Sequence, residues 1–159
     1  MSMRLRRAAL ALARISLLVP LAASACPRKH EFEDINPAVP GAHFKRIATI
    51  SADASHNAIR LMITVRDKLK TAGIDAQPSS GRWESAADAV SQVCAPGVDL
   101  PVDGVLIMSY DHMTLYDCQT ARPAYDIQGS PMSGGMGIDE MTKHLIKYLQ
   151  GKSTESGRP

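Results

Sequence analysis

Apolar residues recur at spacings that predict alternating strands and helices. Between residues 55 and 72 they follow steps of three and four, which is typical of one buried helix face. Gly73 can end this helix. The same period predicts a last helix over 138–149, with acidic residues in its first turn and lysines later, as the helix dipole favours. The apolar positions of the first helix are Ala58, Met62, Val65, Leu69 and Ala72.

Shorter apolar segments predict strands at 44–51, 74–77 and 105–110, and a hairpin formed by 113–118 and 124–127. The continuous run at 105–110 is typical of a central strand buried on both faces. A further helix is predicted over 84–94. The order is β-α-β-α-β-β-β-α, in which strand-helix-strand units imply right-handed parallel crossovers. We therefore expect an α/β fold, a two-layer sandwich of a mixed β-sheet with about three helices.

The first 25 residues have the composition of an export signal. Residues 1–14 contain four arginines and no acidic residue, and an apolar run then ends at Ala23-Ser24-Ala25-Cys26. A basic segment, a short apolar segment and small residues before a cleavage point define a signal peptide. The uncharged run is about half of the ~20 residues that a membrane span needs.

A cysteine directly after this cleavage point resembles the lipobox of bacterial lipoprotein precursors. Ser24 and Ala25 fit the lipobox pattern, and Ala23 stands where leucine is usual. The resemblance implies that Cys26 carries a diacylglyceryl group and a further acyl chain such as palmitate. Several acyl chains hold a protein on a membrane durably, whereas one binds reversibly. Alternatively, Ala23-Ser24-Ala25 fits ordinary signal peptidase, which would release a soluble periplasmic or secreted protein.

The remaining chain divides into three parts. Residues 26–43 contain three prolines among charged residues, which indicates a tether. Residues 44–150 form one domain, since the length suits a single core. Residues 151–159 are polar and are expected to be a disordered tail.

Three cysteines need an explanation in an exported chain. If Cys26 is acylated, Cys94 and Cys118 remain as a pair. An oxidising compartment preserves disulfides, so we expect them to be bonded. The alternative is two buried free thiols.

The charge of the chain changes on export. The full sequence has 18 basic and 16 acidic residues, and removal of four arginines with residues 1–25 leaves a net charge of −2. A slightly acidic protein lacks the electrostatic footprint of a nucleic-acid binder. It also lacks a polybasic segment that would attract anionic lipid.

Polar residues follow two of the predicted strands. Asp53 and His56 come after the first, and Asp111 and His112 come after the run at 105–110. If those strands are parallel neighbours, their carboxyl ends meet where ligands bind in α/β sheets. The four side chains could then hold a divalent metal ion or perform acid–base chemistry. The alternative is that Asp53 caps a helix and that Asp111 and His112 form a turn.

Three other features allow weaker hypotheses. Gly134, Gly135 and Gly137 precede the last helix, where glycines can cradle an anion or form a flexible connection. Met132, Met136 and Met141 with His144 could ligate copper, although Met141 also suits core packing. Trp83 could pack against the helix that follows it, as the residue before its N-cap, or contact a partner.

No nucleophile or zinc-protease motif is present in the sequence. We therefore expect a non-enzymatic lipoprotein of the bacterial envelope. It would be held by a lipid, with the outer membrane favoured because Pro27 is not the aspartate that resembles an inner-membrane retention signal. Its task would be accessory, by binding an envelope protein, and it would need no cofactor. The alternative is a periplasmic protein that binds a metal ion or small ligand.

Overall fold

The computed structural model describes residues 32–53, 55–97, 101–129 and 136–152. The elements in these ranges are β1 (Phe32–Ile35), the 3-10 helix η1 (Gly41–His43), β2 (Arg46–Ser51), α1 (His56–Thr71), β3 (Asp75–Pro78), α2 (Ala86–Val93), β4 (Gly104–Met108), β5 (His112–Asp117), β6 (Arg122–Gln128) and α3 (Ile138–Leu149). From β2 to α3 this is the predicted order, so the α/β class is confirmed. The signal segment 1–25, Cys26 and residues 153–159 lie outside the described ranges.

The strands form one mixed sheet in the order β1-β6-β5-β4-β2-β3. β2 is parallel to both of its neighbours, β3 and β4. The other pairs, β4 with β5, β5 with β6 and β6 with β1, are antiparallel. The expected parallel crossovers and the expected hairpin are therefore both present.

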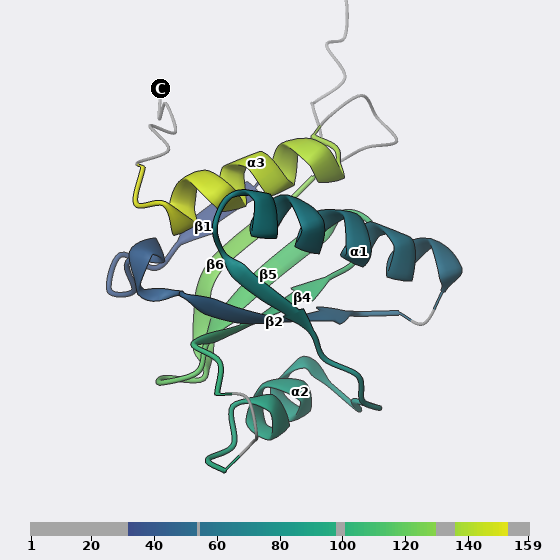
Figure 1. Ribbon diagram of the computed structural model, residues 1–159, viewed down its shortest axis with the longest axis vertical. Helices are drawn as coiled ribbons and strands as arrows, with labels where there is room; N and C mark the ends of the chain where they lie inside the picture. Colours follow the sequence, from purple (N-terminus) through teal and green to yellow (C-terminus); the bar gives the residue numbers. More distant parts are fainter. Residues whose placement is uncertain (1–31, 54, 98–100, 130–135, 153–159) are drawn as a thin grey trace, which may run out of the picture.

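The helices cover both faces of the sheet. Figure 1 shows α1 and α3 side by side on one face and α2 on the other. The chain moves from β2 to β3 in one direction along the sheet and from β3 to β4 in the opposite direction. Right-handed crossovers then place the two connecting helices on opposite faces. The arrangement thus differs from the expected two layers by the single short helix α2.

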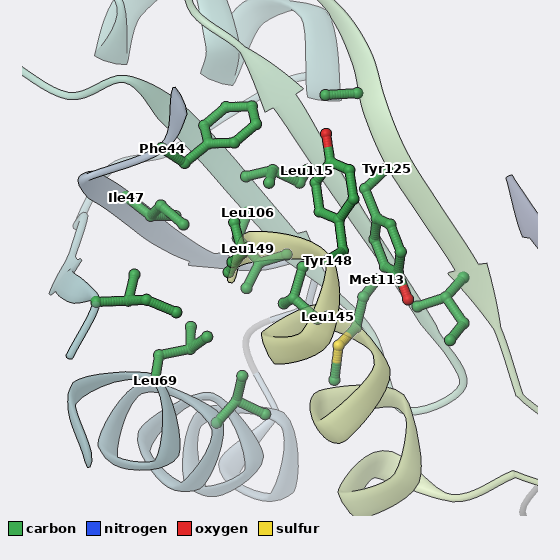
Figure 2. Close-up of a cluster of buried hydrophobic side chains, with 14 of the residues drawn as sticks. Phe44, Ile47, Leu69, Leu106, Met113, Leu115, Tyr125, Leu145, Tyr148 and Leu149 are labelled. Carbon is green, nitrogen blue, oxygen red and sulfur yellow. The ribbon is translucent and has the colours of Figure 1, made fainter. Parts of the chain in front are cut away.

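Side chains of β2 alternate between two apolar clusters. Ile47 packs into the larger cluster beneath α1 and α3, together with Leu69 and Leu145. Figure 2 shows this cluster, in which the rings of Tyr125 and Tyr148 lie side by side, with centroids 4.9 Å apart. Ala48 and Ile50 face the smaller cluster beneath α2. The alternation follows from the two-residue period of a strand.

The predicted tether was wrong for residues 32–43. Phe32–Ile35 pair with β6 as an edge strand, and η1 contacts α3. The Tyr125 hydroxyl donates to Glu33 Oε1 at 2.9 Å, and His144 Nδ1 lies 3.3 Å from Glu33 Oε2. These partners lie about a hundred residues further along the chain, so no local pattern indicates the pairing. Residues 32–43 therefore belong to the folded domain together with the residues from 44 onward.

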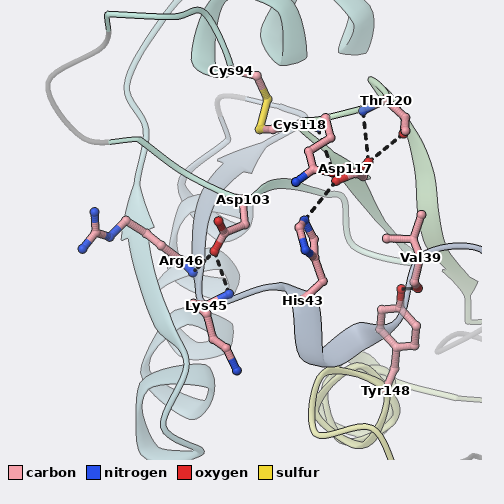
Figure 3. A network of polar contacts seen from close by, with 11 residues as sticks. Val39, His43, Lys45, Arg46, Cys94, Asp103, Asp117, Cys118, Thr120 and Tyr148 are labelled. Carbon is pink, nitrogen blue, oxygen red and sulfur yellow. Dashed lines mark hydrogen bonds and ion pairs between the residues drawn. A yellow bond between two sulfur atoms is a disulfide. The ribbon is translucent and has the colours of Figure 1, made fainter.

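Two buried or half-buried carboxylates fix the loops at one end of the sheet (Figure 3). Asp103 Oδ2 accepts from the backbone N–H groups of Lys45 and Arg46, at 2.7 and 2.8 Å. Asp117 is 2% exposed and accepts from the backbone N–H and the hydroxyl of Thr120 in the β5–β6 turn. Buried carboxylates need such donors, because an unpaired buried charge is costly.

The helices of the described ranges are too short or too polar to cross a membrane.

Replacing Tyr148 tests how the N-terminal segment is held. Its buried hydroxyl donates to the carbonyl oxygen of Val39 at 2.7 Å, and burial raises its pKa to about 12. Since an unfolded tyrosine titrates near 10, this group contributes stability that is full below pH 10 and is lost as the pH rises towards 12. Tyr148→Phe should lower the free energy of unfolding by about 1 kcal/mol at pH 8 in urea titrations.

The same variant should lose less stability than the wild type between pH 10 and pH 12. Equal losses in the two proteins would show that Tyr148 does not hold its proton in the folded state.

Candidate functional site

The carboxyl ends of β2 and β4 lie next to each other. Ser51 is in register with Met108, and the backbone N–H of Ala52 donates to the Met108 carbonyl oxygen at 2.7 Å. β3 continues the sheet on the other side of β2. The chain moves outward from β2 to β3 and then returns past β2 to β4, so the carboxyl ends of β2 and β4 meet at the type of position where α/β folds form binding crevices.

Four polar residues were predicted to meet here. In the structure, three of them have hydrogen-bond partners outside this set. Asp53 accepts a hydrogen bond from the backbone N–H of Ser55 at 2.6 Å. Asp111 accepts from the Ser109 hydroxyl at 3.1 Å, within the β4–β5 turn. His112 Nε2 lies 2.8 Å from Asp126 Oδ1 on β6. His56, the first residue of α1, is exposed.

Asp111 lies in a turn, as in the structural alternative, whereas the cap of α1 is Ser55 and not Asp53. Hydrogen bonds from Ser55, first from its side chain and then from its backbone, hold the pKa of Asp53 below its ordinary value. Ser55 in turn is the N-cap of α1 and accepts from the Ala58 N–H at 3.2 Å. In the part of the chain that the structure describes, no three His, Cys, Asp or Glu side chains are grouped so that they could hold a metal ion.

A groove of about 520 Å³ opens beside these strand ends. This volume is within the range of small-molecule and side-chain pockets. Its walls come from the end of β2, the first turns of α1, the 79–86 segment and β4. Its apolar lining includes Ile50, Ile59, Met62, Trp83, Ala89 and Ile107.

Trp83 is the only tryptophan of the chain and forms one wall of this groove. It is half-buried and packs on the cluster beneath α2. A Cβ at Gly81 would lie 2.3 Å from Trp83 Cζ2, so only glycine lets the chain pass this close to the indole ring. The ring is therefore held in place by backbone as well as by packing.

The local sequence also explains the start of α2. Ser85 is the N-cap and accepts from the backbone N–H of Asp88 at 3.1 Å, and Asp88 Oδ2 accepts from the Glu84 N–H at 3.2 Å. This is a reciprocal cap of the capping-box type. Trp83 thus lies two residues before the N-cap, one further than the sequence suggested. The position leaves its ring at the groove as well as against the cluster.

Ile59, in the first turn of α1, also lines the groove and is 40% exposed. Partly exposed aromatic residues such as Trp83 are enriched in contact surfaces between proteins. Asp53, Arg82 and Glu84 stand among the lining residues and add charge. The groove could not be predicted from the sequence, because its walls come from four separate segments.

The methionine and glycine hypotheses find little support in the described geometry. Met141 is fully buried in the core, and His144 lies against Glu33. Met136 packs against the core, and Met132 lies outside the described residues. Gly137 is the N-cap of α3, while Gly134 and Gly135 lie outside the described residues.

Cys94 and Cys118 form a disulfide, as predicted. It joins the end of α2 to the residue after β5 (Figure 3). Helix α2 is otherwise held to the sheet by a small apolar cluster. The disulfide therefore fixes the helix that carries one wall of the groove.

No protein-family model matches the chain, and no curated protein matches it. Among solved structures it is similar to the PelC dodecamer of Paraburkholderia phytofirmans, with 12% identity, a TM-score of 0.42, and coverage of 77% of this chain and 95% of that chain. A single-residue variant of the same protein gives 12% identity and a TM-score of 0.43, over 77% of this chain and 96% of that chain. A likeness at this level carries no argument about function.

Removing the disulfide tests its contribution to the domain. The double variant Cys94→Ser, Cys118→Ser should lower the free energy of unfolding by about 3 kcal/mol. The bond joins residues that are 24 positions apart in the sequence, and it therefore restricts the unfolded chain. Denaturant titration of the oxidised wild type and of the variant measures this difference. Identical midpoints would mean that the two sulfurs are not bonded in the isolated protein.

Replacing Gly81 tests the fixed position of the indole ring. In Gly81→Ala the new methyl group must displace Trp83, so the tryptophan emission should shift to longer wavelength as the ring becomes exposed. Because the chain has one tryptophan, the signal has one source. Ser80→Ala, an exposed neighbour, is the control and should leave the spectrum unchanged. An unchanged spectrum in both variants would contradict the close packing.

Proposed function

We propose that this chain is a non-enzymatic lipoprotein of the bacterial envelope, anchored through Cys26, that binds a protein partner in the groove between Ile59 and Trp83. The anchor follows from the signal-like segment and the cysteine behind it. The outer membrane, with the domain on its periplasmic side, is the proposed location. The disulfide is compatible with this location, since exported proteins keep such bonds.

The groove is the observation that supports partner binding. Its lining is mainly apolar, one wall is an aromatic ring held in place, and charged side chains stand among the lining residues. Aromatic residues in preformed pockets are where binding energy concentrates in protein interfaces. An apolar side chain of the partner, entering between Ile59 and Trp83, would bury surface that both proteins otherwise expose to water.

Intact-mass measurement of the protein purified from membranes tests the anchor. The expected mass is that of residues 26–159 less two hydrogen atoms lost on forming the disulfide, with the mass of the acyl groups added. A water-soluble product that begins at Cys26 without acyl groups would contradict anchoring and leave the groove proposal standing.

A charge placed in the groove tests partner binding. Ile59→Glu should abolish copurification of a crosslinked partner from envelopes, because a carboxylate cannot be buried there without a counter-charge. Ser91→Glu adds the same charge to an exposed position of α2 outside the groove lining and should leave binding intact. Equal recovery with both variants, both folded by circular dichroism, would contradict the proposed site.

A further inference from the structure

Charges are segregated between the two sides of the domain. Helices α1 and α3 with the adjoining Lys152 carry seven lysines and arginines against three carboxylates. The remaining described residues carry four basic and ten acidic side chains. The domain is therefore acidic as a whole, while its layer of two helices is basic.

Ion pairs within the helical layer account for all three of its carboxylates. Asp67 pairs with Arg66, Asp139 with Lys68, and Glu140 with Lys143. The Lys68–Asp139 pair joins α1 to α3, with the charged atoms 2.6 Å apart. Four basic residues of this layer have no ion pair with a described residue: Arg60, Lys70, Lys147 and Lys152.

These four residues are exposed and belong to the outer face of the layer. Arg60 and Lys70 lie on the side of α1 away from the buried Val65 and Leu69. Lys147 likewise lies on the side of α3 away from the buried side chains of that helix. Ile63, 40% exposed, lies on α1 between Arg60 and Lys70. The outer face of the layer is therefore basic, with one partly exposed apolar side chain among its cations.

The start of the domain limits how far this layer can be from a bilayer. Residue 32 already belongs to β1, whose Glu33 contacts His144 of α3. Six residue steps separate it from Cys26, and an extended chain of that length spans about 20 Å at most. An acylated Cys26 would therefore hold α3 close to the lipid headgroups.

We propose that the outer face of α1 and α3 lies against anionic phospholipid headgroups of the membrane that holds Cys26. This rests on the anchoring part of the proposed function. Each basic residue near such a surface strengthens binding roughly fivefold. Because the attraction decays over about 8–10 Å in physiological salt, it acts only on a domain held this close. The acidic sheet side is repelled by the same surface and faces away from it.

Lysine reactivity in reconstituted vesicles tests this orientation. The acylated protein is placed in vesicles of phosphatidylcholine alone or mixed with phosphatidylglycerol, and a bulky, membrane-impermeant amine reagent labels its lysines. Labelling of Lys70, Lys147 and Lys152, read by mass spectrometry, should fall severalfold in the anionic vesicles only. Lys45, exposed outside the helical layer, should react equally in both. High salt should remove the protection.

A variant without the four cations, but with the lipid anchor, separates the effect of charge from the effect of being held near the membrane. With Arg60→Gln, Lys70→Gln, Lys147→Gln and Lys152→Gln, the protein stays on vesicles through its anchor, and Lys143 should be protected in neither lipid mixture. Equal labelling of the helix lysines and Lys45 in the wild type would overturn the proposal. So would protection that appears only after envelope proteins are added, which would mean an acidic protein partner. Failure of anchoring is a separate result, because an unacylated protein would not sediment with neutral vesicles.

Discussion

The position of β2 between two parallel neighbours determines the rest of the structure. β3 and β4 lie on its two sides, so the chain has to cross the sheet twice in opposite directions. Right-handed connections then require α1 and α2 on opposite faces. Side chains of β2 must satisfy both layers, with Ile47 under α1 and Ile50 under α2. The groove opens where these two connections diverge.

The edge strand β1 determines how far the folded domain can lie from a membrane that holds Cys26. It is short and pairs on one side only, so its place depends on the hydrogen bond from Tyr125 to Glu33 and on the nearby His144. With β1 in the sheet, residues 32–43 are part of the folded domain instead of a spacer. A lipid on Cys26 would then bring the helical layer to the headgroups. The groove opens at the strand ends and uses residues other than the four unpaired cations of that layer, so lipid and protein could be contacted together.

Much of the fold could be predicted because its signals are local. The periods of α1 and α3 are visible in the positions of Val65, Leu69, Met141 and Leu145, and the apolar run that contains β4 indicated a buried strand. β1 could not be predicted, since two of its four residues are acidic and its partners are distant in sequence.

The candidate site was predicted only in part. The two strands are the parallel neighbours that the site hypothesis required, but the side chains of Asp53 and Asp111 turn to serines two residues away. The groove and the basic layer escaped prediction for one reason. Trp83 and Ile59, like Lys70 and Lys147, come from separate segments that only folding brings onto one surface.

Photocrosslinking in living cells tests most directly whether the groove contacts a partner. A benzoylphenylalanine in place of Ile59 lies in the groove wall, and one in place of Ser91 lies outside the groove lining. We predict one discrete protein adduct from position 59 and none from position 91. The absence of an adduct at position 59, or the same adducts from both positions, would contradict a partner-binding role for this groove.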